Sequence, residues 1–359
     1  MTSQKSDIER YKSLANVASM DMKDPVAGAI YRRMHAEGAP VRDMRAAHLG
    51  MFMAPYLKEI SEIDIALVGV PLENSIPLQV STAQAPDALR EWSQWQGPVH
   101  PLWRTVPFDT FSAADYGNLA FKSEDLPTRI DEIEAAYRPF ADAGINTLSV
   151  GGEHTLTLGV IRALAAQQPL GLLMVDAHSD TGGGILPWDH TILAINDASP
   201  FRYAVMEGLI DPKRCVQIGI RGRPEHFWEF GHEVGIRIIS AEELEDRGVA
   251  SVIAEALEIV GKGPAYLSID NDGIDPAEMP ATGLPEPFGV SARDTRRIIR
   301  AARCLDIVGA DFVELSPAND PTSQSTNIGA ALCFEMLCVL SEARTRRTDK
   351  RRQTKWNRG

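Results

Sequence analysis

From residue 60 onward, short runs of β-branched and aliphatic residues alternate with longer segments of helical periodicity. This alternation is typical of successive βαβ units. Several short runs are apolar on both faces, as strands of a parallel sheet are when helices cover both sides. With right-handed crossovers, the sequence predicts an α/β fold, a three-layer α/β/α sandwich with a doubly wound, mainly parallel sheet. The predicted strands span residues 64–70, 146–150, 172–176, 215–218, 236–239, 265–269 and 306–312, and the predicted helices span residues 126–143, 156–167, 201–208, 241–260, 291–302 and 328–344.

The chain contains no internal repeat and no low-complexity linker, which favours one domain over two. We expect an N-terminal extension over residues 1–60, a single α/β domain over residues 61–343, and a tail over residues 344–359. The tail is rich in Lys and Arg, and we interpret it as solvated and disordered. A hydrophobic content of 44% in 359 residues is enough to bury a full core, which excludes disorder throughout.

Acidic residues outnumber basic ones, since 49 Asp and Glu against 36 Lys and Arg give a formal net charge of −13. This charge argues against nucleic acid or an anionic membrane as the main partner and favours a cationic or neutral ligand. The N-terminus lacks the apolar core of a signal peptide, and no stretch approaches the roughly 18–20 apolar residues that span a bilayer. We therefore expect a cytoplasmic protein. Its 4 cysteines show no CxxC or CxxxH spacing, so neither a disulfide framework nor a zinc knuckle is predicted.

Polar segments follow four of the predicted strands. They read GGEHT (151–155), DAHSD (176–180), DNDGIDP (270–276) and VELSP (313–317). Ligands of an open parallel sheet bind in the crevice beyond the carboxyl ends of its strands. The first three segments therefore bring to one edge of the sheet a set of His and Asp side chains, namely His154, Asp176, His178, Asp180, Asp270 and Asp272.

These two imidazoles and four carboxylates suit a pair of divalent cations, whose charge balances that of the carboxylates. Without metal, four ionised Asp side chains would repel one another and raise one another's pKa values. Alternation along a strand predicts that Asp176 and His178 face one side together, as do Asp270 and Asp272. We expect His154 to hold mainly one ion and His178 the other, while Asp176 and Asp270 bridge the ions. Two ions about 3.5–4 Å apart can share a water and ionise it near neutral pH.

Taken together, GGEHT, DAHSD, SIDNDGIDP followed by PATGLPEP, and VELSP resemble the motifs of the ureohydrolase family, which includes arginases, agmatinases and guanidine hydrolases. The resemblance extends over nearly all of residues 64–340. It implies an arginase-like fold, and it implies that the six His and Asp side chains are metal ligands. It also implies that Glu314 binds a guanidinium group and that His190, in the segment WDH, carries a proton to the leaving amine. The implied reaction is attack of hydroxide on a guanidinium-type carbon, followed by loss of an amine.

Three segments depart from the family pattern. The familiar PGTGTPEPGG reads PATGLPEPFG here, and an apparent insertion follows His190. Residues 71–88 contain no basic residue that could pair with the carboxylate of arginine. We expect Trp188 and Phe288 to line the pocket mouth, where aromatic faces attract a cation. Within the family the chain looks most like the guanidine hydrolase and metformin hydrolase branch. That likeness implies a small guanidine or biguanide cation as substrate, with an amine or ammonia and a urea-type compound as products.

The same resemblance implies two divalent ions per subunit, Ni²⁺ or Mn²⁺, and the ligands do not choose between them because His and Asp serve both. It also implies a homo- or hetero-oligomer, with a hexamer expected. Two other functions stay open: agmatinase or guanidinobutyrase activity, and a non-catalytic or auxiliary subunit of a hetero-oligomeric ureohydrolase. The intact ligand set argues against a subunit that binds no metal. A mononuclear zinc deacetylase of related fold is disfavoured, because it would not use His154 or both Asp270 and Asp272.

Overall fold

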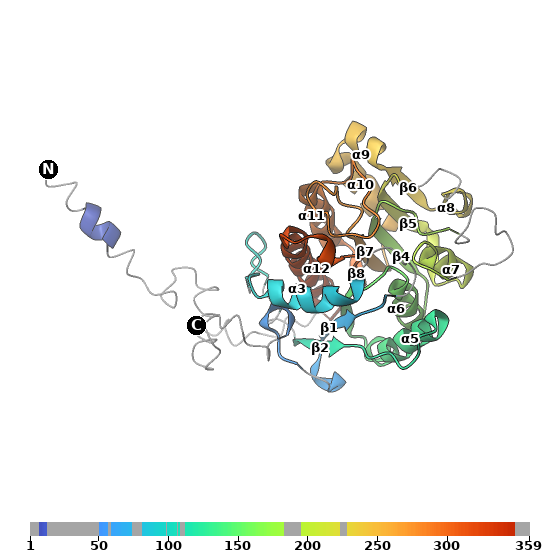
Figure 1. Cartoon of the computed structure of the whole chain (residues 1–359), viewed down its shortest axis with the longest axis horizontal. Coiled ribbons are helices and arrows are strands. Elements are labelled where there is room, and N and C mark those ends of the chain that lie inside the picture. Colours follow the sequence, from blue (N-terminus) through green and yellow to red (C-terminus); the bar gives the residue numbers. More distant parts are fainter. Residues whose placement is uncertain are drawn as a thin grey trace.

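The computed structural model describes residues 7–12, 50–56, 59–73, 81–97, 99–105, 107, 112–182, 195–222 and 228–348. Within these ranges the chain forms one eight-stranded sheet with helices on both faces, which confirms the predicted three-layer sandwich (Figure 1). The strand pairs are all parallel. The strands are β1 (Ile65–Val70), β2 (Ala113–Asn118), β3 (Asn146–Gly151), β4 (Leu170–Val175), β5 (Ile210–Ile220), β6 (Arg237–Ser240), β7 (Pro264–Asp270) and β8 (Asp306–Val313), in the order β2-β1-β3-β8-β7-β4-β5-β6.

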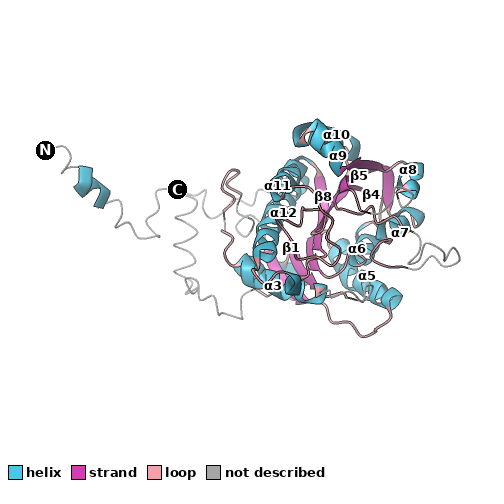
Figure 2. Cartoon of the chain, turned by 45° about the horizontal axis from the view of Figure 1, so that its top comes forward, coloured by secondary structure: helices cyan, strands magenta, loops and turns pink. Residues whose placement is uncertain are grey.

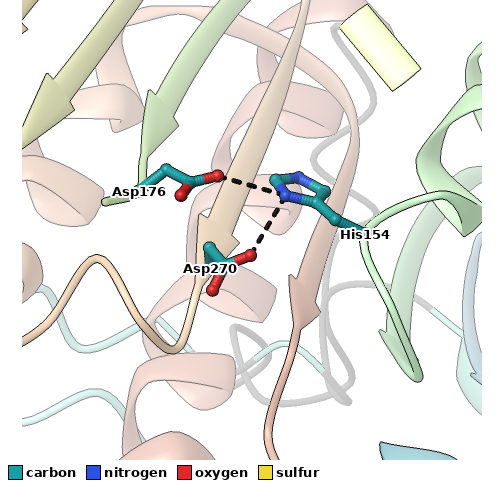
Figure 3. A group of neighbouring side chains, drawn as sticks. All are labelled: His154, Asp176 and Asp270. Atoms are coloured by element: carbon teal, nitrogen blue, oxygen red, sulfur yellow. Dashed lines mark ion pairs between the residues drawn. The ribbon is translucent and has the colours of Figure 1, made fainter. Parts of the chain in front are cut away.

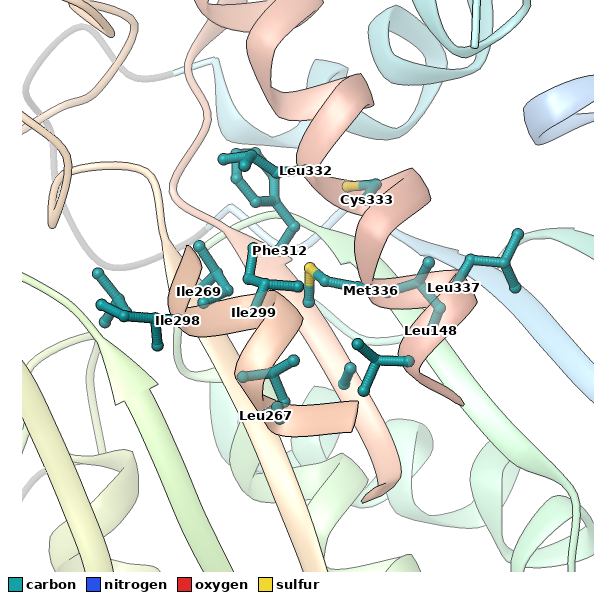
Figure 4. Packing of buried hydrophobic residues seen from close by; sticks show 14 of the residues in the cluster. Leu148, Leu267, Ile269, Ile298, Ile299, Phe312, Leu332, Cys333, Met336 and Leu337 are labelled. Carbon is teal, nitrogen blue, oxygen red and sulfur yellow. The ribbon is translucent and has the colours of Figure 1, made fainter. Parts of the chain in front are cut away.

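Helices lie on both sides of the sheet, as Figure 2 shows by colour. One face is covered by α3 (Ala85–Ser93), α9 (Ala241–Arg247), α10 (Val249–Val260), α11 (Ala292–Ala301) and α12 (Gln324–Thr348), and the other by α5 (Leu126–Asp142), α6 (Leu156–Leu164), α7 (Pro200–Met206) and α8 (Glu229–Val234). On the first face, Ile299 of α11 and Met336 of α12 lie over strand residues such as Leu148 and Leu267 (Figure 4).

The strands are apolar on both faces because each face is covered. All residues of β1 are buried. Ile65 and Leu67 belong to one hydrophobic cluster, whereas Ala66, Val68 and Val70 belong to the other. Successive side chains of a strand point to opposite faces, so the sheet separates two cores. A strand of this kind is a continuous apolar run in the sequence, which is why these strands were predictable.

The last helix, α12, is longer than the predicted span of residues 328–344. Its final turn is held by side chains that reach other elements: Arg344 donates to the Gly144 carbonyl and to Asp64 (2.8 Å), and Arg347 pairs with Asp306 (2.6 Å). Residues 344–348 are thus helical and not part of a disordered tail, while residues 349–359 lie outside the described ranges. The helix is long and apolar enough to cross a membrane, but 78% of its most apolar window is buried, as in a core helix.

Two other differences from the predicted elements have local causes. Residues 241–260 form two helices, α9 and α10, because Gly248 between them has φ 74°, a left-handed conformation that ends α9 and favours glycine. The strand β2 was not predicted, because it lies at the sheet edge and contains a charged residue, Asp115. That carboxylate is fully buried but accepts a hydrogen bond from the Arg90 guanidinium at 2.8 Å.

Candidate metal centre

The four strands whose exits carry the candidate ligands are neighbours in the middle of the sheet, in the order β3-β8-β7-β4. The register pairs Val175 with Ile269, which sets Asp176, just past β4, beside Asp270 at the end of β7. Asp270 in turn pairs with Val313 of β8. The chain passes from β3 to β4 across β8 and β7, and such a switch in strand order opens the crevice where α/β proteins bind ligands.

His154 lies in the turn between β3 and α6, and its Nδ1 atom faces three carboxylates. Nδ1 lies 2.9 Å from Oδ2 of Asp180. It lies 3.1 Å from Oδ2 of both Asp176 and Asp270, which converge on this nitrogen in Figure 3. All four side chains are buried. His154, Asp176 and Asp270 thus offer one nitrogen and two oxygens close enough together to hold one metal ion.

A buried chain of hydrogen bonds orients the His154 ring from its other side. Nε2 of His154 lies 2.8 Å from the Ser268 hydroxyl, which donates to Oδ1 of Asp311 at 2.6 Å. The other oxygen of Asp311 accepts from the hydroxyls of Thr157 (2.5 Å) and Tyr266 (2.8 Å). Because Ser268 gives its only proton to Asp311, its oxygen accepts from Nε2–H of His154. When the ring is neutral, its Nδ1 lone pair is therefore directed toward the carboxylates, as binding of a metal ion requires.

His178 forms a second group with Asp176 and Asp272. Its Nδ1 lies 3.1 Å from Oδ2 of Asp272 and 3.9 Å from Oδ1 of Asp176. Asp176 therefore belongs to both groups, whereas Asp270 belongs to the first. Gly222 is packed against the His178 ring, since an added Cβ there would lie 2.4 Å from Nε2. A larger residue at that position would displace the ring.

The candidate ligands meet because of the turns that carry them, and not because of the expected alternation along a strand. β4 ends at Val175, so Asp176 and His178 lie beyond the strand. The His178 N–H donates to Oδ1 of Asp176 (2.6 Å), and the Asp272 N–H donates to Oδ1 of Asp270 (2.8 Å). In both turns an Asp side chain accepts from the backbone two residues later, which curls the chain so that the second ligand returns toward the first.

Charge repulsion is strong in this cluster. Burial raises the pKa of Asp176 and of Asp270 well above the usual Asp value, and neighbouring carboxylates raise it further. Burial alone would lower the pKa of His154, but the carboxylates of Asp176, Asp180 and Asp270 beside Nδ1 raise it well above the ordinary value. Burial opposes ionisation of Asp272 as well, yet the adjacent His178 lowers the Asp272 pKa below its usual range. Bound protons and imidazolium groups thus offset charge that divalent cations would otherwise neutralise.

Three buried polar atoms of these side chains have no hydrogen-bond partner among the residues that the structure describes, namely His154 Nδ1, Asp176 Oδ2 and His178 Nε2. Leaving such a group unpaired costs about 1–3 kcal/mol. His154 Nδ1 and Asp176 Oδ2 lie 3.1 Å apart, and both could bind the same cation. Imidazole nitrogens and carboxylate oxygens are suitable ligands for divalent transition metals. The residues therefore fit a pair of such ions.

An acidic rim, which we define as Glu153, Asp197 and Glu314, lies next to the candidate metal ligands. Glu314 follows β8 with φ 57°, and its Oε1 accepts from the backbone N–H of His154 at 2.7 Å. Burial raises the pKa of Glu314 well above the usual Glu value, and Asp270 and Asp197 raise it further. Burial also raises the pKa of Asp197 to about 7, with Glu153 among the nearby carboxylates that add to the shift. The rim favours a positively charged ligand.

The remaining predicted site residues are placed differently or not described. Phe288 has φ 64° and is 86% exposed, so its ring is not enclosed by a pocket wall within the single chain. Trp188 and His190 lie outside the described residues, as do residues 183–194 generally. Their predicted roles stay predictions.

Ser268 and Asp311, which orient His154, are not among the site residues predicted from the sequence. Ser268 precedes Asp270 by two positions in the same strand, so strand periodicity could have linked them. Asp311 is a charged residue inside an otherwise apolar strand, β8, and it is fully buried. A buried charge in a central strand is unusual enough to have been a signal.

Comparisons with known proteins agree on one family. Residues 63–338 match the model of the arginase family. The chain is 39% identical to the guanidinopropionase of Pseudomonas aeruginosa over 309 residues, which cover 84% of this chain and 95% of that protein. It is 38% identical to the guanidinobutyrase of the same organism over 286 residues, covering 79% and 88%. A solved structure of proclavaminate amidino hydrolase from Streptomyces clavuligerus aligns with a TM-score of 0.78 and 28% identity, covering 84% of this chain and 100% of that chain.

Proposed function

The chain belongs to the arginase family, and on that premise we propose that this hydrolase uses two divalent metal ions to cleave a C–N bond of a small guanidine or biguanide cation. The observation that carries the proposal is the convergence of two His and four Asp side chains at adjacent strand exits beside Glu314. Members of the family hydrolyse guanidino compounds, and we infer the class of reaction from them. The acidic residues around the site support a cationic substrate.

Each metal ion has its own histidine. We assign His154 and Asp180 to one ion, His178 and Asp272 to the other, and Asp176 to both. Asp270 is close to the His154 side and is the second bridging candidate. When bound, the ions supply a Lewis acid and a water that ionises near neutral pH. Ni²⁺ and Mn²⁺ both suit this set of nitrogen and oxygen ligands.

The chain's own residues bind the substrate and move the proton. Glu314 orients a planar guanidinium, because a carboxylate accepts two parallel N–H bonds from it. The hydrogen bond from the His154 N–H restrains the Glu314 carboxylate for that task. His190 donates a proton to the leaving nitrogen, since an imidazole with the ordinary pKa of about 6.5 can do so at neutral pH.

Charge selects the substrate. A cation beside the acidic rim of Glu153, Asp197 and Glu314 would lower the raised pKa values of Asp197 and Glu314 and be attracted by the ionised carboxylates. Residues 71–88 contain no basic residue that could pair with a substrate carboxylate. A substrate carboxylate forced into such surroundings would lose its hydration without gaining a partner. That loss costs roughly several kcal/mol, or a discrimination of about a thousandfold. Guanidine and dimethylbiguanide (metformin) lack a carboxylate, so we expect both to be accepted.

The test is a substrate panel with two metals. Metal-free protein is loaded with Ni²⁺ or with Mn²⁺, and elemental analysis should return close to two ions per active chain. Release of urea, amine or ammonia is then measured from guanidine, metformin, agmatine, 3-guanidinopropionate and 4-guanidinobutyrate. We expect the highest kcat/KM on guanidine or metformin. An active preparation with a metal content near zero would refute the proposed mechanism.

A second candidate function is hydrolysis of a guanidino acid. The chain's similarity to a guanidinopropionase and a guanidinobutyrase, at 39% and 38% identity, favours it. Comparable kcat/KM on 4-guanidinobutyrate and guanidine would show that the site does not reject a substrate carboxylate, and would establish this candidate. No turnover of any compound, with both metals bound, would instead favour an auxiliary subunit.

Assembly is part of the proposal. We expect a homo- or hetero-oligomer, with a hexamer as the family resemblance implies. Large apolar side chains are exposed on the single chain, among them Leu102 (68%) and Phe288 (86%), which is consistent with burial between subunits. Mass photometry of the purified chain measures the mass directly, and a monomer at micromolar concentration would contradict this expectation.

A further inference from the structure

Glu286 carries a carboxylate next to the histidine of the second metal group. It lies in the loop between β7 and α11. Its Oε1 is 3.5 Å from Nε2 of His178, the ring nitrogen opposite the one that faces Asp272. This Nε2 is buried and makes no hydrogen bond within the described ranges. Metal-binding imidazoles ordinarily donate their second N–H to a carboxylate, carbonyl or water. A small rotation of Glu286 would supply the acceptor that His178 needs.

Arg221, just past β5, fixes the loop that carries Glu286. Its five N–H groups donate to backbone carbonyls at 2.6–3.2 Å, with the single Nε–H shared between two of them; the acceptors are the carbonyls of Gly219, Asp272, Gly273, Glu286 and Pro287. Arg221 thereby joins the loop that carries Glu286 to the turn that carries Asp272. An added Cβ at Gly289 would lie 2.4 Å from Nη2 of Arg221, so glycine is needed there for the loop to approach.

We propose that Glu286 is a positioning residue for the metal ion on the His178 side. Glu286 accepts the Nε2–H of His178 and holds Nδ1 toward the ion, and Arg221 keeps the Glu286 backbone in place. The inference rests on the proposed metal-dependent function. On the His154 side, Ser268 and Asp311 do the corresponding work inside the core. The histidines of the two groups are therefore supported by different residues. Removing Glu286 should weaken the binding of one ion and leave the binding of the other unchanged.

The experiment titrates Mn²⁺ into the full-length metal-free chain and counts bound ions from the EPR signal of free Mn²⁺. Glu286→Ala removes the acceptor, whereas Glu286→Gln keeps an acceptor oxygen without the charge. We expect one of the two dissociation constants to rise about 10–100-fold in Glu286→Ala and less in Glu286→Gln, with the other unchanged. The EPR signal of a spin-coupled Mn²⁺ pair should appear at correspondingly higher Mn²⁺ concentration.

Glu245→Ala is the matched control, because Glu245 is an exposed carboxylate on α9 and its loss changes the net charge equally. It should leave both constants unchanged. If both Glu286 variants bind both ions as the parent does, the inference is wrong while the proposed function stands. An equal rise in both constants would also overturn it, since that result indicates general damage to the site. If the parent itself binds no metal, the proposed function fails first.

Arg221→Lys tests whether the hydrogen bonds from Arg221 hold the Glu286 loop in place. A single ammonium cannot reproduce the planar, multidentate hydrogen bonding of the guanidinium. We expect the same metal constant to rise as in Glu286→Ala, with less than additive loss in the double variant, because both changes act through one contact. Fully additive losses would show that Arg221 does not act through Glu286. The Glu286 variants remain a valid test even if Arg221→Lys fails to fold.

Discussion

Asp176 is buried between His154 and His178, and three further carboxylates lie in the same cluster. At a protein surface, water would screen the repulsion among these carboxylates, but here the side chains are buried. When no cation is bound, the repulsion within this cluster is consequently offset only in part. Residue-scale changes should therefore affect metal binding and turnover before they affect the fold.

Removing a ligand on the His178 side should abolish activity. We predict that His178→Ala or Asp272→Ala eliminates nearly all turnover, because each removes a ligand atom and leaves the other carboxylates undercompensated. Steady-state kinetics with saturating metal measures the loss. Activity within about tenfold of the parent, a barrier change of only about 1.4 kcal/mol, would contradict the ligand assignment.

Glu314 should behave differently from the ligands. We predict that Glu314→Gln weakens catalysis far more than metal binding, because the amide keeps the shape but loses the charge-assisted pair with a guanidinium. The hydrogen bond from the His154 N–H can persist to the amide oxygen, so the turn should remain in place. The measurement compares kcat/KM with the metal content. Loss of metal with an unaltered KM would assign Glu314 another role.

At the scale of elements, the contact between α5 and α6 depends on Gly159. A Cβ added there would lie 2.7 Å from the Ile130 carbonyl and 2.8 Å from Cβ of Ile133, both in α5. Because the nearest atom is backbone, the helices must separate to admit a methyl group. The turn before α6 carries His154, so this packing also supports the metal centre.

We predict that Gly159→Ala destabilises the protein, although alanine is the better helix former. The helix propensity gain is about 1 kcal/mol, whereas overpacking costs about 1–3 kcal/mol. Urea denaturation measures the free energy of unfolding. Gly97→Ala is the control, since a Cβ there would meet its nearest neighbour at 3.9 Å. Equal or greater stability of Gly159→Ala would refute the tight contact.

For the whole molecule, bound metal should stabilise the fold, and more so at higher pH. Binding contributes about 2.7 kcal/mol per site at 100 times Kd. In the metal-free fold, burial raises the pKa of Asp176 and of Asp270, so these groups retain protons under mildly acidic conditions. Their stabilising contribution as neutral acids is present below the unfolded-state pKa of about 3.9 and is lost as pH rises through the folded-state values.

We therefore predict that Mn²⁺ or Ni²⁺ raises Tm, and that this increase is larger at pH 8 than at pH 5, because protons compete with the ions at low pH. Differential scanning calorimetry of metal-free and loaded protein at both pH values tests this. Addition of a chelator should return the loaded protein to the metal-free Tm. A larger increase at pH 5 would contradict the role of the raised Asp pKa values.

Most strands and helices, and the set of candidate ligands, could be predicted from the sequence. β1 was predictable because its residues form a short, continuous apolar run, IALVGV. Such a run is typical of a parallel strand that helices cover on both faces. His154, His178 and the Asp residues were predictable as partners because parallel strands end at one edge of the sheet. In both cases the evidence is local in the chain, or follows from a general rule of the fold.

The contacts between individual atoms, by contrast, depend on the packing of the whole chain. The register of β4, β7 and β8 sets Asp176 beside Asp270, and Asx-type turns aim the second ligand of each motif. The support of His154 by Asp311 spans more than 150 residues, and the contact of Glu286 with His178 spans more than 100. Neither follows from local periodicity, because side-chain contacts across strands depend on register and packing, which the whole sequence sets together.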